Sequence, residues 1–261
     1  MTIQSVDRAI DIIYLFSISR ASLGITEIAA SLTLSKGTVW SLVDTLEKRG
    51  FLQKDRENRK YRIGPRLYEL GMAYIGGLEI NSRASRPVHR LASRTRLNAR
   101  VGIWEGGAVL ITLLALPKAE VSMSQQIGPR VPSYCSAVGK ALLAYLEPAE
   151  LQNYLAGAVL RRYTPNTIVD PTKLLEDLDK TRERGFSIGR EEMIPGNAAL
   201  GAPIFGRKKE LVGAISISGA PKTVLGDRLD KLAHELLLTA SEISREMGYY
   251  LSAVEQGNGN R

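Results

Sequence analysis

Few side chains in this sequence are of the types that carry out catalysis. The chain has one cysteine, Cys135, and two histidines, His89 and His234, which lie far apart on expected helices. Neither histidine has a Cys, Asp or Glu at the spacing of metal ligands, so we expect no metal site. A lone thiol without a neighbouring base is typical of a buried structural cysteine. We therefore predict no catalytic residue here.

The adjacent acids Glu191 and Glu192 are a further candidate pair for catalysis. Neighbouring residues on a strand point to opposite faces, so these carboxylates are expected to be structural or to lie at the rim of a site. The sequence has no phosphate-binding loop, dinucleotide fingerprint or nucleophile elbow. These observations argue against an enzyme and against a bound cofactor.

Hydroxyl side chains at short spacing point instead to ligand binding. Ser216 and Ser218 lie two apart in the run LVGAISIS, so both face one side of a strand. Ser136 is expected to cap a helix whose free N–H groups suit a carboxylate. Buried hydroxyls need hydrogen-bond partners, which either a polar ligand or the sheet backbone could supply.

The first 64 residues combine short helices with a basic hairpin. Ser5, Thr26 and Ser35 are expected to cap three helices, and Gly50 to end the third in a left-handed conformation. Two strand-like runs, 51–55 and 60–64, follow around a charged turn. This order of elements is typical of a winged helix-turn-helix, which binds DNA.

The third helix, residues 36–49, has an apolar stripe on one face and small polar residues on the other. Such a polar face suits entry into the major groove, and the basic hairpin suits phosphate contacts. Trp40 lies beside the stripe, so its indole either covers the edge of the core or meets DNA. The predicted DNA-binding residues are Thr26, Ser35, Lys36, Gly37, Thr38, Trp40, Ser41, Thr45, Arg56, Arg59 and Lys60.

The charge of the chain agrees with an acidic partner. The net charge is +8, and residues 1–66 contain 11 Lys and Arg against 7 Asp and Glu. Residues 81–100 contain six Arg and no acid, and Arg83, Arg86, Arg90 and Arg94 recur at a spacing that indicates a solvated helix face. No signal peptide and no apolar run long enough to cross a membrane is found, so we expect a cytoplasmic protein that does not bind membranes.

The remainder of the chain predicts an α/β domain. A connecting helix is expected over 65–80, and strands over 99–105, 108–116, 120–127, 186–190, 200–206 and 211–218. Helices are expected over 136–146, 148–155, 171–184 and 226–250. Helices on the faces of a sheet would leave a pocket at one end of it.

Several segments together resemble the IclR family of bacterial transcription regulators. They include SVDRAIDIIYLF, ITEIAASLTLSKGTVWSLVDTLEKRGFL and RVPSYCSAVGKALLAYL, and the similarity covers about residues 5–250. The resemblance implies an α+β chain with a winged helix-turn-helix (1–64), a linker helix (65–84) and a GAF-like effector and oligomerisation domain (85–256). It also implies a homodimer or a dimer of dimers on a pseudo-palindromic DNA site.

The sequence departs from the family at positions that bear on specificity. The family usually has Ser, His and Arg at Gly37, Trp40 and Ser41, so a different operator is expected. It often has an acid at Gly189 and a Cys at Ala199. The effector site carried over from the family, with neighbours added from local chemistry, comprises Met123, Val131, Ala137, Val138, Gly189, Arg190, Asn197, Ala199, Ser216 and Ser218.

These departures enlarge the expected pocket and remove a negative charge. We therefore expect a small organic acid larger than a three-carbon keto acid, such as an aromatic carboxylate against Met123 and Val131, with Arg190 turned toward it. Repression is favoured over activation. The alternative is an architectural DNA-binding protein that responds to no ligand, whose C-terminal domain only mediates assembly.

Overall fold

The computed structural model describes residues 2–19, 22–117 and 130–250. The chain forms two compact units, and the division between them falls between Gly77 and Leu78. This division lies inside the segment 65–84 that was expected to link the two domains. The expected strand over 120–127 lies outside the described residues.

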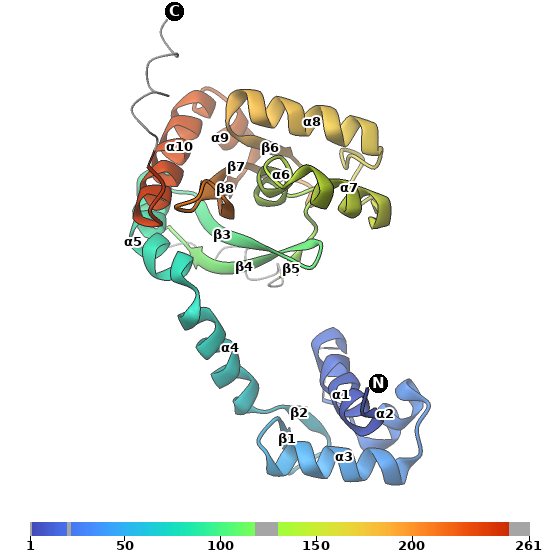
Figure 1. The fold of residues 1–261 in the computed structure, drawn as a ribbon. Helices are drawn as coiled ribbons and strands as arrows, with labels where there is room; N and C mark the ends of the chain where they lie inside the picture. Colours follow the sequence, from blue (N-terminus) through green and yellow to red (C-terminus); the bar gives the residue numbers. More distant parts are fainter. Residues whose placement is uncertain (1, 20–21, 118–129, 251–261) are drawn as a thin grey trace, which may run out of the picture. The chain divides into compact units, whose positions relative to one another are not determined.

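The N-terminal unit is a winged helix-turn-helix followed by a fourth helix, as predicted (Figure 1). β1 and β2 pair in antiparallel fashion, and Leu23 forms an isolated bridge to Tyr61 that extends this small sheet. The elements are α1 (Gln4–Ser19), α2 (Ile25–Leu32), α3 (Lys36–Lys48), β1 (Leu52–Lys54), β2 (Tyr61–Ile63) and α4 (Pro65–Gly77).

The ends of these helices confirm some predicted caps and correct others. Ser35 caps α3, because its Oγ accepts a hydrogen bond from the backbone N–H of Thr38 at 3.1 Å. The predicted caps at Ser5 and Thr26 are wrong. α1 already begins at Gln4, and Gly24 is the N-cap of α2. The carboxylate of Glu27 reaches back to the N–H of Gly24 at 2.6 Å, which starts this helix before Thr26.

The core of the N-terminal unit joins all three of its first helices to the wing. Its buried apolar side chains are Ile12, Phe16, Ile28, Ala29, Val39, Val43, Leu46, Leu52 and Tyr61. Val6 and Ile10 are 51% and 44% exposed, although both belong to the apolar face expected for α1. α1 therefore packs on the core through Ile12 and Phe16 and leaves other apolar residues at the surface.

The C-terminal unit is built on a six-stranded sheet in the order β5-β4-β3-β8-β7-β6, with antiparallel pairing throughout. β3 and β4 join across Gly106 and Gly107, which both have positive φ as a tight hairpin requires. The strands are β3 (Asn98–Glu105), β4 (Ala108–Ala115), β5 (Arg130–Val131), β6 (Ser187–Arg190), β7 (Ala198–Phe205) and β8 (Leu211–Gly219).

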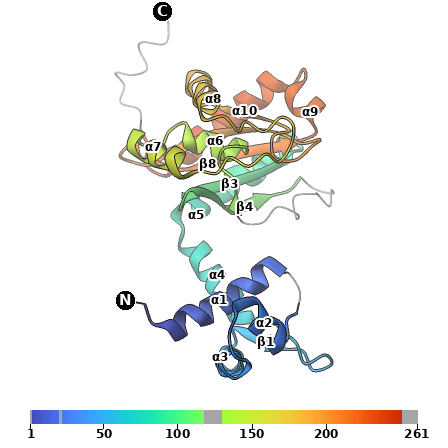
Figure 2. The ribbon, with the colours of Figure 1, turned by 90° about the vertical axis from the view of Figure 1, so that its right-hand side faces the viewer.

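Helices cover both faces of this sheet (Figure 2). They are α5 (Glu79–Thr95), α6 (Ala137–Leu143), α7 (Pro148–Gly157), α8 (Pro171–Arg184), α9 (Pro221–Leu225) and α10 (Leu229–Glu246). α5 and α10 pack side by side, and large apolar strand residues such as Val101, Leu200 and Ile215 form the main core with them. The opposite face carries small residues and packs against α6.

Two glycines allow α6 to approach its neighbours at backbone distance. A Cβ at Gly201 on β7 would lie 2.6 Å from the carbonyl carbon of Ala137, and one at Gly139 would lie 2.7 Å from the carbonyl carbon of Ser133. Real Cβ atoms do not approach this closely, so any larger residue would push α6 outward. The small residues on this face therefore fix the position of α6.

Candidate functional site

The polar face of α3 is exposed in the structure. Its hydroxyls are partly engaged with their own helix, since Ser41 Oγ donates to Gly37 O at 3.2 Å and Thr45 Oγ1 donates to Ser41 O at 2.9 Å. The hydroxyl oxygens still have room to accept. Ser35, Lys36, Gly37, Trp40, Ser41 and Thr45 are exposed, Thr38 is half-buried, and Thr26 is exposed in the first turn of α2.

The indole of Trp40 is at the surface, with 58% of the residue exposed. The adjacent Val39 and Val43 are fully buried, so the core beneath α3 is closed without the indole ring. A large exposed aromatic side chain on a helix that also carries small polar residues is available to meet a sugar or a thymine methyl group.

Of the three cationic side chains of the wing that were predicted to bind DNA, two are exposed and one is already paired. Arg56 and Arg59 are exposed, and Arg59 has a positive φ of 55° at the tip of the turn. Asp55 stabilises this turn by accepting from the N–H of Glu57 at 2.9 Å. Lys60, by contrast, lies 2.8 Å from Oε1 of Glu27. Its ammonium therefore ties the wing to α2 in the structure.

The C-terminal unit has a partly open pocket with a cavity of about 50 Å³ between α6 and the small-residue face of the sheet. Gly189, Ala199 and Ser218 stand side by side on three neighbouring strands, as the strand register places them. Eight of the ten predicted effector residues line this cavity, namely Val131, Ala137, Val138, Gly189, Asn197, Ala199, Ser216 and Ser218.

The other two predicted effector residues do not join them. Met123 lies outside the described residues. Arg190 is exposed and is not part of the cavity wall, so the expectation that it turns toward the site is wrong. Side chains alternate along a strand, and Gly189 occupies the cavity side of β6, which leaves Arg190 on the other side.

Six further residues line this cavity that were not in the predicted effector set, and Arg100 is the most informative of them. It was counted with the arginines of residues 81–100, although it falls in the strand expected over 99–105, and only 9% of it is exposed on β3. A single charged residue within the apolar run RVGIW was the available signal. Ser136 had been considered only as a helix cap and Glu192 only as a structural or rim residue. The six residues are Arg100, Ile111, Cys135, Ser136, Glu192 and Met193.

The arginines of α5 are solvated or paired, as expected. Arg90 lies 2.5 Å from Glu242, and Arg94 lies 2.7 Å from Glu235, so these two side chains link α5 to α10. Arg83 pairs with Glu79 within α5 at 3.2 Å. These contacts lie away from the cavity and stabilise the helical face of the unit.

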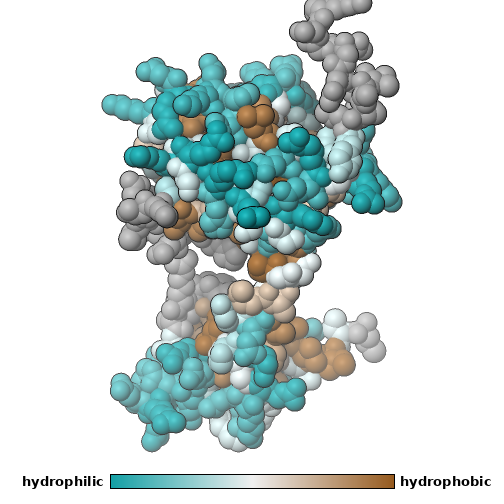
Figure 3. Space-filling view, turned by 90° about the vertical axis from the view of Figure 1, so that its left-hand side faces the viewer, coloured by the Kyte–Doolittle hydropathy of each residue, from teal (hydrophilic) through white to brown (hydrophobic). Residues whose placement is uncertain are grey.

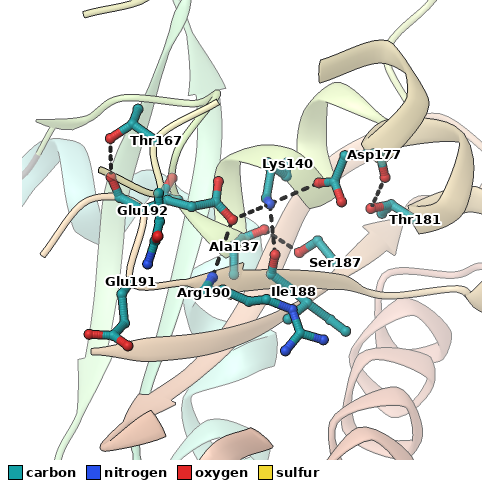
Figure 4. Close-up of polar contacts among 12 residues, drawn as sticks. Ala137, Lys140, Thr167, Asp177, Thr181, Ser187, Ile188, Arg190, Glu191 and Glu192 are labelled. Atoms are coloured by element: carbon teal, nitrogen blue, oxygen red, sulfur yellow. Dashed lines mark hydrogen bonds and ion pairs between the residues drawn. The ribbon is translucent and has the colours of Figure 1, made fainter. Parts of the chain in front are cut away.

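A group of charges adjoins the cavity, and Glu192 belongs both to this group and to the cavity wall (Figure 4). Lys140 on α6 donates to Oε1 of Glu192 at 2.7 Å and to the carbonyl of Ile188 at 2.7 Å, and it lies 2.8 Å from Asp177 on α8. The backbone carbonyl of Glu192 accepts from Thr167 Oγ1 at 2.6 Å. This network holds the loop after β6 against α6 and α8.

Cys135 lies in the cavity wall and is 2% exposed, which agrees with the predicted structural thiol. Burial, with a smaller effect of the nearby Glu192 carboxylate, raises the pKa of this thiol to about 12. The thiol is therefore protonated at neutral pH and is a poor nucleophile. Ser136 behaves as the predicted cap of α6, because its Oγ accepts from the N–H of Gly139 at 3.2 Å.

Both units match models of one protein family. The model described as the IclR helix-turn-helix domain matches residues 5–56, and the model described as the bacterial transcriptional regulator IclR C-terminal matches residues 72–245. The chain belongs to the IclR family. It is a DNA-binding transcription regulator, and this family is not enzymatic.

Individual IclR-family members resemble the chain over almost all of its length. The HTH-type transcriptional regulator XynR of Escherichia coli strain K12 is 33% identical over 95% of this chain and 98% of its own. The HTH-type transcriptional repressor AllR of the same strain is 32% identical, over 94% of this chain and 90% of its own. These matches extend through both units.

The solved structure of an IclR homologue from Microbacterium hydrocarbonoxydans, complexed with 4-hydroxybenzoate, has the same fold. Its TM-score is 0.80 at 22% identity, over 93% of this chain and 98% of that chain. Among the described residues of this chain, no helix is long and apolar enough to cross a membrane. The same residues contain no group of three or more His, Cys, Asp and Glu side chains that could hold a metal ion.

Proposed function

We propose that this regulator represses transcription by binding a pseudo-palindromic operator, and that a small organic acid in the C-terminal cavity controls this binding. The cavity carries the proposal, because its wall combines the hydroxyls of Ser216 and Ser218 with the amide of Asn197 and with apolar side chains. A small number of polar groups in a mainly apolar, concave space is typical of small-molecule sites. The relative AllR is named a repressor, and a homologue of the same fold binds 4-hydroxybenzoate.

On the DNA side, we propose that α3 enters the major groove and that the wing contacts phosphates. The exposed Gly37, Trp40 and Ser41 are placed to contact base edges, and Arg56 and Arg59 to contact the backbone. Lys60 has a smaller part in this proposal than the sequence indicated, because its ion pair with Glu27 competes with a phosphate.

We propose a dimer because apolar residues remain uncovered on the N-terminal unit. Val6 on α1, Tyr68 and Met72 on α4 are 51%, 71% and 51% exposed. On the face drawn in Figure 3, several apolar side chains of this unit reach the surface. Contiguous exposed apolar residues mark interaction sites. A two-fold symmetric dimer would read two half-sites about one helical turn apart, or a multiple of that.

Operator binding is tested by footprinting and by titration at several salt concentrations. A symmetric footprint with paired half-sites and a steep fall of affinity with salt is expected. A single asymmetric site bound by one protomer would contradict the proposal. If organic acids bind the chain but leave its operator affinity unchanged, the architectural alternative is favoured instead.

The size of the acid is tested at Gly189 and Ala199, which pair directly across β6 and β7. A Cβ at Gly189 would lie 3.6 Å from the Cβ of Ala137, so an Asp there has room to enter the cavity. The combined Gly189→Asp and Ala199→Cys variant should lose binding of 4-hydroxybenzoate, because a carboxylate and a thiol then occupy its space. Unchanged affinity in this variant, measured by calorimetry, would argue against an acid of this size.

A further inference from the structure

Arg100 is a cation buried against the cavity without a matching carboxylate. Its Nη1 donates to Ser218 Oγ at 3.0 Å, and this is the one side-chain hydrogen bond that the described residues give it. A guanidinium carries five N–H donors, so most of its hydrogen-bonding capacity remains unused. Burying a charge is costly unless it is paired.

The other charges near the cavity are paired with charges of opposite sign. Lys140 pairs with Glu192 at 2.7 Å and with Asp177 at 2.8 Å, and Arg184 lies 3.9 Å from Asp177. Each of these two cations thus has a carboxylate beside it. Among the described residues, no Asp or Glu lies within ion-pair distance of Arg100, and burial lowers the pKa of its guanidinium.

A second unsatisfied atom belongs to the same cavity. Oε1 of Glu192 is taken by Lys140 and by the N–H of Arg190, whereas Oε2 is buried and accepts no hydrogen bond from the described residues. An ionised carboxylate can only accept. The atom that would satisfy Oε2 is therefore a hydrogen-bond donor.

We propose that the effector is an organic acid with a hydrogen-bond-donating substituent, a hydroxyl or an N–H, whose carboxylate pairs with Arg100 and whose donor meets Oε2 of Glu192. Arg100 and carboxylates match in geometry, because the planar guanidinium donates two parallel hydrogen bonds. This inference rests on the proposed function in one respect, namely that the cavity is the effector site.

Matched small molecules, added to the full chain, test the carboxylate contact and the hydrogen-bond-donor contact separately. Lactate is compared with propionate and lactamide, and 4-hydroxybenzoate with benzoate and 4-hydroxybenzamide, by thermal melting and calorimetry. We expect at least one of the two hydroxy acids to bind more tightly than its acid without the hydroxyl, and its amide to bind least. The proposal is wrong if neither hydroxy acid binds, or if an amide binds as tightly as its acid.

Variants of Arg100 locate the carboxylate. Loss of a charge-assisted hydrogen bond in Arg100→Met should weaken the bound hydroxy acid roughly 10- to 100-fold. Arg100→Lys should weaken it less, because the charge is kept but the planar pair of donors is lost. The exposed Arg96 supplies the control, and Arg96→Met should leave the affinity unchanged.

Glu192→Gln locates the donor. Lys140 selects the amide oxygen of the new side chain, so the NH₂ group takes the place of Oε2 and donates instead of accepting. The preference for the hydroxy acid over its partner without the hydroxyl should then fall, because the hydroxyl loses its charged acceptor and can only accept a neutral hydrogen bond from the NH₂ group. An unchanged preference overturns this half of the proposal.

The same variants separate this inference from the proposed function. Operator binding by Arg100→Met and Glu192→Gln without any acid shows that both variants are folded. If the acid binds through Arg100 but does not change the affinity for the operator, the proposed acid-binding contact is supported and the proposed control of DNA binding is wrong. Acid binding that survives in folded Arg100→Met with unchanged affinity instead shows that Arg100 pairs within the protein, for example with Glu192, and overturns the assignment.

Discussion

The ammonium of Lys140 lies 2.7 Å from Oε1 of Glu192, and the two side chains are 1% and 5% exposed. Replacing Lys140 by Met should lower the free energy of unfolding by about 3–5 kcal/mol, because the buried Glu192 and the half-buried Asp177 then lose their cation. Urea unfolding measures this difference. The control is Lys48→Met, which breaks the exposed pair with Asp44 and should have a much smaller effect. Equal losses in both variants would contradict this account of the buried network.

Removal of the arginines of the wing should weaken binding to all DNA sequences to a similar degree. Arg56→Ala is suitable for this test, whereas Arg59→Gly is the better choice at a φ of 55°, where glycine avoids strain. Each change should make the dependence of log affinity on log salt shallower by about one. Arg83→Ala on α5 is the control. A variant that changes base preference instead would place that arginine at a base edge.

Trp40→Ala should alter the preferred operator sequence and leave the melting temperature nearly unchanged, because the indole is 58% exposed. Selection of binding sites from a random DNA pool measures the preference. Val39→Ala, one residue earlier and fully buried, should lower the melting temperature through the cavity that it leaves. If Trp40→Ala melts as early as Val39→Ala, the indole belongs to the core.

Two glycines that face α6 should respond very differently to the same methyl group. Gly201→Ala would place its Cβ 2.6 Å from the Ala137 carbonyl carbon and 2.7 Å from Ser187 Oγ, so a loss of about 1–3 kcal/mol in unfolding free energy is expected. Gly189→Ala meets its nearest atoms at 3.6 Å, which is an ordinary contact, and should be nearly neutral. Denaturant unfolding of both variants compares them, and equal effects would contradict the fixed position of α6.

Stability should decline at high pH because of Cys135. Burial raises the pKa of this thiol from 9.0 to about 12, so above pH 9 the unfolded chain loses its proton while the folded chain keeps it. The stabilisation is complete below pH 9 and is lost as the pH rises toward 12. Cys135→Ala should reduce the part of the decline that begins near pH 9, as measured by urea unfolding across this range. A curve identical to that of the unchanged chain would show that other groups, such as Tyr134, account for it.

Most of the cavity could be predicted because the resemblance to the IclR family supplied its residues. Local periodicity added an independent argument for Ser216 and Ser218 only, since side chains alternate along a strand, and the same rule, applied to Gly189, would have turned Arg190 away. Arg100 falls in the strand expected over 99–105, but it was left out of the predicted site because it was considered only as part of the charge of residues 81–100.

Contacts between distant segments could not be predicted from local patterns. Lys140 sits in an apolar helix, and its partners Asp177 and Glu192 are 37 and 52 positions away along the chain. The predicted cap at Thr26 failed for a local reason. Thr26 has the right side chain for an N-cap, but the carboxylate of Glu27 satisfies the N–H of Gly24 and moves the start of α2.

The glycines beside α6 also decide which parts of the pocket wall can adjust. α6 meets its neighbours at backbone distance at Gly139 and Gly201, so this helix has little room to shift when the cavity of about 50 Å³ is filled. Under the proposed function, adaptation to one acid or another therefore falls on side chains of the wall such as Ile111 and Met193, which can change rotamer while the backbone stays in place.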